Sequence, residues 1–389
     1  MEFLSRISTE TELDKIFDDL SDGVSGHWDI AFIFIAGFNE DSTKLIAGHV
    51  REELGLDPLI GCAGYGVIGP EKEVEDAPSV SLLLARLPGV RCMPFHLDQS
   101  QYDSLTSEEE WYDLMDVYPN EKPKFVVFTE STNTAMNAFL EGMNQAYPDS
   151  PVVGALTGVD NNPKENLFIL NQKYYGQGLL GVCFIGNIHI ETIVSQGCRP
   201  VGESYIVTQA EDNVIYELAG RPFYEVLEDV INDASERDQR LAQDAIFIGI
   251  AMNEYKHRMK QGDFMIRLLM AIDDESGAGI ITDTVQVGQT VRFHVRDPVS
   301  ADLDLKTMLN EHKNELVRLA PKGGLIFSCS ARGEELFGTQ NHDTGLLYEY
   351  LGHIPVAGLF SAGEVGPVYG KNYLHGVSIC IALFYPEEK

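Results

Sequence analysis

Two linked apolar runs set the expected fold: Pro355-Val-Ala-Gly-Leu-Phe-Ser-Ala-Gly-Glu-Val-Gly-Pro367 and, after a short polar loop, Leu374-His-Gly-Val-Ser-Ile-Cys-Ile-Ala-Leu-Phe384. Both runs are typical of buried strands, and the glycines with Pro367 predict a tight loop between them. The same pattern occurs from Leu54 to Ala85. Leu54 aligns with Leu351, and this offset matches ten identical residues without a gap, including four glycines and two prolines. We interpret the match as an internal duplication.

Working outward, each copy contains a β-α-β-β pattern. In the first copy we expect strands at Ile30–Ala36, Leu59–Cys62 and Ser79–Leu87, with a helix over Asp41–Leu54 capped by Asp41 or Ser42. In the last copy we expect a strand over Leu325–Cys329, a helix over Thr344–Leu351 and strands from Pro355 onward. Phe125–Thr129, Met136–Tyr147 and Pro151–Ala155 predict a third, degenerate copy, whose loop Gly158–Glu165 lacks the glycine pattern. The predicted fold class is α/β (mixed α+β), with mixed sheets flanked by helices.

The length of 389 residues is too great for one ordinary core, so we expect two domains. Glycine and proline cluster in Gln196–Gly202, which predicts a boundary there. The expected modules are residues 1–200 and 201–389, packed tightly because no long linker is evident. Further helices are expected at Thr9–Leu20, Glu108–Asp116, Pro222–Ile231 and Leu303–Leu319.

The charge balance excludes some partners. The chain has 28 basic and 60 acidic residues, a formal net charge of −32. Nucleic acids and anionic membranes need basic surfaces, so we expect neither as a partner. The simplest interpretation of the acidity is a solvated surface.

The cysteines and the N-terminus predict a cytoplasmic protein. The six cysteines are dispersed and form no CxxC pair, so neither a zinc ribbon nor a thioredoxin motif is present. Met1–Ser5 shows no signal-peptide pattern, and no apolar run approaches the ~20 residues of a membrane helix. Free thiols fit a reducing compartment.

Several long motifs of the second half, with Gly61-Cys62 of the first, carry a family resemblance. They are Val287–Asp297, Phe327–Gly333 with Leu336-Phe-Gly338, Asn341-His-Asp343, Pro355–Phe384 and Gly197–Gly202. With them the chain resembles a FIST protein, a sensory protein with an N-terminal and a C-terminal FIST module, from about Asp29 onward. The resemblance implies intracellular sensing of small ligands such as amino acids or their derivatives. Signalling output then needs a partner protein or homo-oligomerisation, since no output segment is evident.

The candidate ligand-binding residues lie in the second half. Cys329, Ser330, Arg332 and Gly333 follow a buried strand, where open α/β sheets build their sites. Arg332 suits a ligand carboxylate through two parallel hydrogen bonds, and the alternative is a structural ion pair. Cys329 is either an inert buried thiol or a nucleophile.

Loops supply the other candidates. Asn341 and His342 precede a predicted helix on which Asp343 is the expected N-cap. Gly363 and Glu364 lie in the glycine loop, and Glu364 suits a ligand ammonium. The first copy has Gly66-Val67 instead, where related N-modules often carry Gly-Glu, so a site there is expected to be altered. His375 completes the set.

We considered three other functions. Gly64-Tyr-Gly-Val-Ile-Gly69 matches a dinucleotide fingerprint, but the acidic Pro70–Asp76 follows it where a helix is needed. No ligand spacing supports a metal, so we expect no cofactor, no metal and no catalytic residue. A Cys329–His342 acyl transferase or hydrolase, and an interaction scaffold with a vestigial pocket, stay as alternatives to the sensor.

Overall fold

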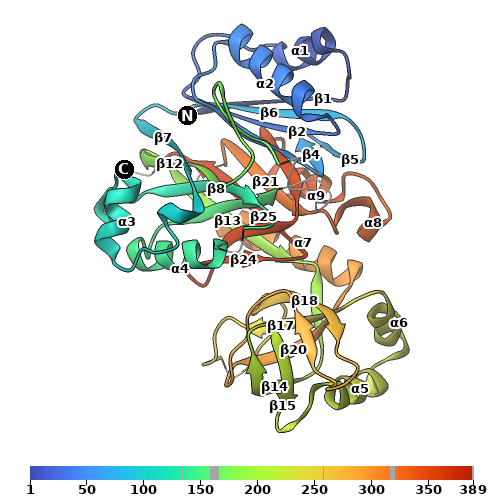
Figure 1. The fold of residues 1–389 in the computed structure, drawn as a ribbon. Helices are drawn as coiled ribbons and strands as arrows, with labels where there is room; N and C mark the ends of the chain where they lie inside the picture. Colours follow the sequence, from blue (N-terminus) through green and yellow to red (C-terminus); the bar gives the residue numbers. More distant parts are fainter. Residues whose placement is uncertain (134, 158–165, 257, 316–319, 388–389) are drawn as a thin grey trace. The chain divides into compact units, whose positions relative to one another are not determined.

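The computed structural model describes residues 1–133, 135–157, 166–256, 258–315 and 320–387, and Figure 1 shows the fold. The predicted mixed α/β class is confirmed: helices accompany sheets that contain both parallel and antiparallel strands. The chain forms two compact units. The first contains Met1–Val194, Lys306–Leu374 and Ile379–Lys389, and the second contains Ser195–Leu305 and His375–Ser378. The last part of the sequence thus belongs largely to the same unit as the first part.

Three six-stranded sheets make up most of the first unit. Their strands, in spatial order, are as follows: β1 (Glu2–Ser8), β6 (Ser79–Arg86), β2 (Ile30–Ala36), β3 (Leu59–Gly64), β10 (Phe168–Leu170) and β11 (Lys173–Tyr175); β24 (Lys371–His375), β23 (Gly363–Val368), β9 (Val152–Thr157), β8 (Lys124–Glu130), β12 (Leu179–Gly186) and β7 (Val90–Leu97); β13 (His189–Gln196), β25 (Ser378–Tyr385), β21 (Gly323–Cys329), β22 (Val356–Ser361), β4 (Gly66–Gly69) and β5 (Lys72–Glu75).

Each of these sheets contains the same strand trio. The central strand of the trio (β2, β8 or β21) is parallel to one neighbour (β3, β9 or β22) and antiparallel to the other (β6, β12 or β25). In each trio, the strand parallel to the central one carries a glycine: Gly61 on β3, Gly154 on β9 and Gly358 on β22. A Cβ there would lie 1.7–1.8 Å from the carbonyl oxygen of Ile33, Val127 or Ile326 on the central strand. At all three positions the backbone of the central strand leaves no room for a side chain, so each position requires glycine.

On each central strand, the residue after Ile33, Val127 or Ile326 points into a shared core. Phe34, Phe128 and Phe327 contact one another edge to face, with ring centroids 5.6–6.3 Å apart. All three are fully buried. Because side chains alternate along a strand, one face of each sheet reaches this core while the other is left for helices.

In sequence, a pair of short strands lies between the parallel and the antiparallel neighbour of each trio's central strand, and its first strand pairs with a strand of another trio. β4 follows β3 in the chain but pairs with β22, at Ile68 and Gly358. β10 follows β9 but pairs with β3, and β23 follows β22 but pairs with β9. The three trios thus exchange hairpins in a closed cycle.

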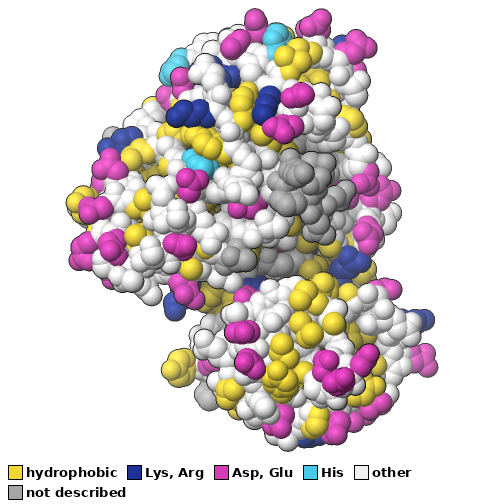
Figure 2. Space-filling view, in the orientation of Figure 1, with side chains coloured by type: hydrophobic (Ala, Val, Ile, Leu, Met, Phe, Trp, Pro, Cys, Tyr) yellow, Lys and Arg dark blue, Asp and Glu magenta, His cyan; other side chains and the backbone are white. Residues whose placement is uncertain are grey.

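Helices cover the outer faces. α1 (Leu13–Ser21) and α2 (Glu40–Leu54) pack on β2, and α3 (Glu108–Met115) and α4 (Met136–Ala146) pack on β8. α7 (Pro298–Glu315) runs from the second unit into the first, and α8 (Gly333–Phe337) and α9 (His342–Leu351) follow β21. Acidic side chains are scattered over the face shown in Figure 2, as expected for this composition. No helix in the described residues is both long and apolar enough to cross a membrane.

Within the described residues, the second unit contains a seven-stranded sheet. Its strands are, in spatial order, β14 (Cys198–Glu211), β20 (Thr290–Arg296), β17 (Ile246–Ala251), β18 (Phe264–Ile272), β19 (Gly279–Ile281), β15 (Val214–Leu218) and β16 (Arg221–Pro222). β14 also pairs with β15 and so closes the sheet on itself. α5 (Phe223–Asp233) and α6 (Glu236–Asp244) accompany them. The apolar face of α5 buries Phe223, Val226 and Val230 against this sheet.

Most predicted elements are confirmed within one or two residues, and β2 is matched exactly. Several expectations are wrong in detail. The first helix, expected from Thr9, begins at Leu13. Gln196–Gly202, predicted as a domain boundary, consists largely of strand, because β13 ends at Gln196 and β14 begins at Cys198. The side chain that caps α2 is Asn39, which accepts a hydrogen bond from the Ser42 amide. α7 begins at Pro298 rather than Leu303. The end of the predicted helix Leu303–Leu319 and the predicted loop Gly158–Glu165 fall outside the described residues. The module division at residue 200 stays a prediction.

Candidate functional site

Most of the residues predicted for the site lie around the carboxyl ends of β21 and β22. The two strands are parallel and pair Cys329 with Ser361 at their last residues. Arg332 precedes α8, which Gly333 begins, and Asn341 precedes α9, which His342 begins. Gly363 and Glu364 open β23. His375 ends β24 and belongs to the second unit, unlike the others.

A buried ion pair is central to this region. The Arg332 Nε and Nη2 atoms donate to Asp343 Oδ2 and Oδ1 over 2.9 and 3.0 Å. The side-chain exposures are 0% for Arg332 and 3% for Asp343, so the pair is desolvated. Burial by itself would raise the pKa of the Asp343 carboxyl, but the Arg332 charge and the His342 hydrogen bond hold it below its usual range. Asp343 was the expected N-cap of α9, and this is wrong because Asn341 holds that position.

His342 and Glu364 also make defined contacts. The His342 Nδ1 atom lies 3.0 Å from Asp343 Oδ1, and the ring stacks on Phe337 at a centroid distance of 3.5 Å. Glu364 is fully buried, and its Oε1 atom accepts a 2.7 Å hydrogen bond from the Ser361 hydroxyl. Cys329 is buried at 7% exposure, whereas Ser330 is exposed. The Arg332 Nη1 atom has no hydrogen-bond partner among the described residues.

Two carboxylates from the first half of the sequence hold this region. Glu73 Oε1 accepts a 2.6 Å hydrogen bond from the Thr344 amide, and Glu75 Oε1 accepts one of 2.9 Å from the Glu334 amide. Both come from β5, whose hairpin partner β4 pairs with β22. Burial, with the nearby charge of Asp343, raises the pKa of Glu73 to about 7. Sequence reasoning treated Pro70–Asp76 as an acidic loop and missed both; the alternation Glu73-Val74-Glu75 was the available signal for a strand.

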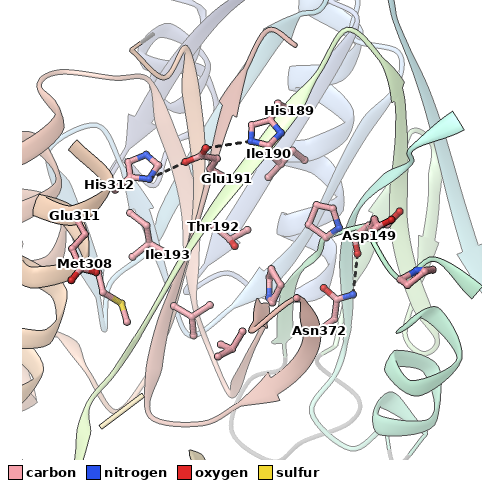
Figure 3. Close-up of a pocket in the computed structure, with 17 residues that line it drawn as sticks. Asp149, His189, Ile190, Glu191, Thr192, Ile193, Met308, Glu311, His312 and Asn372 are labelled. Carbon is pink, nitrogen blue, oxygen red and sulfur yellow. Dashed lines mark hydrogen bonds and ion pairs between the residues drawn. The ribbon is translucent and has the colours of Figure 1, made fainter. Parts of the chain in front are cut away.

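The described part of the chain contains a pocket elsewhere in the first unit (Figure 3). Its volume is about 690 Å³, within the range of small-molecule sites. Figure 3 shows β13 crossing the pocket, with α7 on one side and Asp149 and Asn372 on the other. The lining comprises Pro148–Pro151, His189–Val194, Met308, Glu311, His312, Pro367, Val368, Gly370 and Asn372. None of the nine predicted residues lines it.

A chain of polar contacts crosses this pocket. Glu191 Oε1 lies 3.4 Å from His189 Nε2, and Glu191 Oε2 lies 3.1 Å from His312 Nδ1. The His312 Nε2 atom is 2.8 Å from the hydroxyl of the buried Tyr385. The hydrogen bonds from His189 and His312 lower the pKa of Glu191 to about 2, so Glu191 is an anion at neutral pH. Sequence reasoning did not single out these residues, because their partners are far apart in the chain.

Comparison with known protein families identifies both parts of the chain. The FIST N domain model matches residues 29–221, and the FIST C domain model matches residues 224–367. The chain belongs to the FIST family. FIST domains are associated with sensory roles in signal transduction.

Relatives of this FIST protein occur in mycobacteria. An uncharacterized protein of Mycobacterium tuberculosis strain H37Rv is 36% identical over 329 residues, which cover 84% of this chain and 83% of the relative. An uncharacterized protein of Mycobacterium bovis is 34% identical over 334 residues, covering 85% and 84%. A solved cyanuric acid hydrolase from A. caulinodans aligns over 100% of this chain and 99% of its own, at 8% identity and a TM-score of 0.35. That score is too low to support an argument.

Proposed function

We propose that this FIST protein is a small-molecule-binding sensory protein in cytoplasmic signal transduction, and that its ligand is a small metabolite related to the amino acids. We propose that the ligand binds in the pocket lined by His189–Val194 of β13, which we call the β13 pocket. The observation that carries the proposal is the pocket itself. The pocket has a volume of about 690 Å³ and is lined by both apolar and polar side chains. Both properties are typical of small-molecule sites. The sensory role of FIST domains supplies the biological context.

Two features support the pocket as a ligand site. Glu191, His312 and Tyr385 fix one another's positions through hydrogen bonds, which keeps polar groups oriented before a ligand arrives. β13 is the last strand of its sheet, with β25 as its neighbour, and residues 189–194 of this edge strand line the pocket. Signalling then requires that the ligand bind one conformation better than another. The output passes to a signalling partner or to a homo-oligomer.

The region around Arg332 in the first unit is a second candidate site, comprising Cys329, Ser330, Arg332, Gly333, Asn341, His342, Gly363 and Glu364. One observation favours it: the buried Arg332 Nη1 atom lacks a hydrogen-bond partner within the described residues. A small acceptor that reached this atom would satisfy it. The contacts with Asp343 already occupy Nε and Nη2, so a ligand carboxylate would meet one nitrogen rather than a two-pronged fork.

A thermal-shift screen with amino acids, amines, small carboxylates and nucleotides tests the proposal. A ligand present at ~100 times its Kd adds ~2.7 kcal/mol to the free energy of unfolding. We expect Thr192→Trp, which fills the pocket from β13, to abolish the response. Ser204→Trp, at an exposed position of β14, is the matched control and should leave it intact.

The variants separate the two sites. A response that survives Thr192→Trp and disappears in Arg332→Lys would move the ligand to the Arg332 region. Silence across the panel, with the protein folded and free of co-purified ligand, would favour the interaction scaffold over the sensor.

A further inference from the structure

We propose that the β13 pocket selects an organic cation, an alkylammonium with an apolar body, over an amino acid or a carboxylate. This inference rests on the proposed function, because it names the ligand class of the same pocket. Nothing in the family match assigns a ligand of this class.

The ionisable groups of the lining are acidic or imidazole. Asp149, Glu191 and Glu311 carry carboxylates, and His189 and His312 carry imidazoles. No lysine or arginine occurs among the described residues that line the pocket. A ligand carboxylate would lose water here without gaining a cationic partner, and it would face three carboxylates. The lining therefore disfavours anions and zwitterions.

Glu191 is the main acceptor that a cation would meet. Each of its oxygens contacts one histidine, His189 or His312, so the carboxylate is held in position. A carboxylate offers about four lone-pair sites, so two contacts leave further sites for the N–H groups of an ammonium. Tyr385 holds His312 from the opposite ring nitrogen, which keeps the imidazole turned toward Glu191.

The backbone adds acceptors of the same kind. β13 is an edge strand, and the pocket lies along residues 189–194 of that strand. An edge strand presents a row of carbonyl oxygens and amides without a strand partner. Carbonyl oxygens accept hydrogen bonds from an ammonium as carboxylates do.

The remaining walls suit an alkyl chain. Ile193, Met308, Val368 and Pro151 supply apolar surface around the polar groups. Met308 is half-buried on α7, and methionine adapts its shape to apolar ligands. An ammonium group near Glu191 with its carbon chain along these residues satisfies both parts of the pocket.

Isothermal titration calorimetry with four probes that share an isobutyl group tests the class. The probes are 3-methylbutylamine, leucine, 3-methylbutanoate and 3-methylbutanol, which carry an ammonium, an ammonium with a carboxylate, a carboxylate and a hydroxyl. We expect the amine to bind at least tenfold more tightly than the other three. We expect Glu191→Gln to weaken the amine at least tenfold and to leave the alcohol unchanged, whereas Glu349→Gln, at an exposed position of α9, changes neither.

The outcomes separate this inference from the proposed function. Tighter binding of leucine or 3-methylbutanoate that Thr192→Trp abolishes would overturn the cation class and keep the sensor. Amine binding that is equal in the wild type and Glu191→Gln would also overturn it. Failure of the amine to bind at all overturns the inference, and the broader thermal-shift panel then decides separately whether the pocket holds any ligand.

Discussion

The guanidinium of Arg332 and the carboxylate of Asp343 contact each other through two parallel hydrogen bonds at a fully desolvated position. Loss of one partner leaves a buried charge uncompensated, at a cost of about 3–5 kcal/mol. We therefore expect Asp343→Asn and Arg332→Met each to lower the free energy of unfolding by several kcal/mol in urea titrations. Arg221→Ala, which breaks an exposed pair with Asp229, is the control and should lower the stability far less than either of these variants. Equal small effects in all three variants would contradict the burial argument.

Glu73 makes stability depend on pH. Its pKa is raised to about 7 in the folded protein, against an ordinary value of 4.5, so between these pH values the folded state binds more protons than the unfolded state. Stability from this group is therefore fully present below pH 4.5 and is lost as the pH rises to about 7. Glu73→Gln removes the titration but keeps an oxygen for the Thr344 amide. From pH 5 to 8, we expect the wild type to lose roughly 1–3 kcal/mol relative to this variant in chemical denaturation. Parallel pH profiles would show that Glu73 does not titrate there.

Gly358 tests the close packing within the strand trios. An added Cβ would lie 1.8 Å from the Ile326 carbonyl oxygen, and backbone atoms of a paired strand cannot move aside cheaply. We expect Gly358→Ala to cost about 3 kcal/mol or more, at the upper end for overpacking, measured by thermal unfolding. Gly345 in α9 has open space around it, so Gly345→Ala should be neutral or stabilising by up to about 1 kcal/mol. A mild effect at Gly358 would mean that the strands separate more easily than this packing implies.

The phenylalanine cluster tests the shared core. Phe327 contacts both Phe34 and Phe128 and is completely buried. We expect Phe327→Ala to lower the free energy of unfolding by about 3–5 kcal/mol. Leu45→Ala, on the exposed face of α2, should stay within about 0.5 kcal/mol of the wild type. Urea denaturation of the two variants measures both values.

Local patterns predicted much of the fold. The apolar run Ile30–Ala36 matched β2 exactly, because a strand buried on both faces is apolar at every position. Edge elements were harder: β5 is four residues long and carries two glutamates, so it resembles a loop. Glycine and proline within Gln196–Gly202 hid the start of a strand: Pro200 is paired with His294 in β14, and Gly202 lies at a register shift between β14 and β20.

The site was less predictable than the fold. The motif residues around Arg332 were found because they are consecutive or nearly so in sequence. The pocket depends on four distant segments, near Asp149, Glu191, His312 and Asn372, and only the tertiary fold places them together. Glu191 and His312 are far apart in the sequence, so no local sequence pattern predicts their contact.

The cyclic exchange of hairpins has a consequence for synthesis on the ribosome. When β4 emerges from the ribosome, its partner β22 has not yet been translated, and β9 must likewise wait for β23. These early strands stay exposed as open edges until nearly the whole chain exists. Two of the three sheets of the first unit therefore cannot be completed until the C-terminal segment has been translated, whereas all strands of the β1-β6-β2-β3-β10-β11 sheet lie within residues 2–175. We expect the nascent chain to rely on chaperones that shield the open sheet edges during this interval.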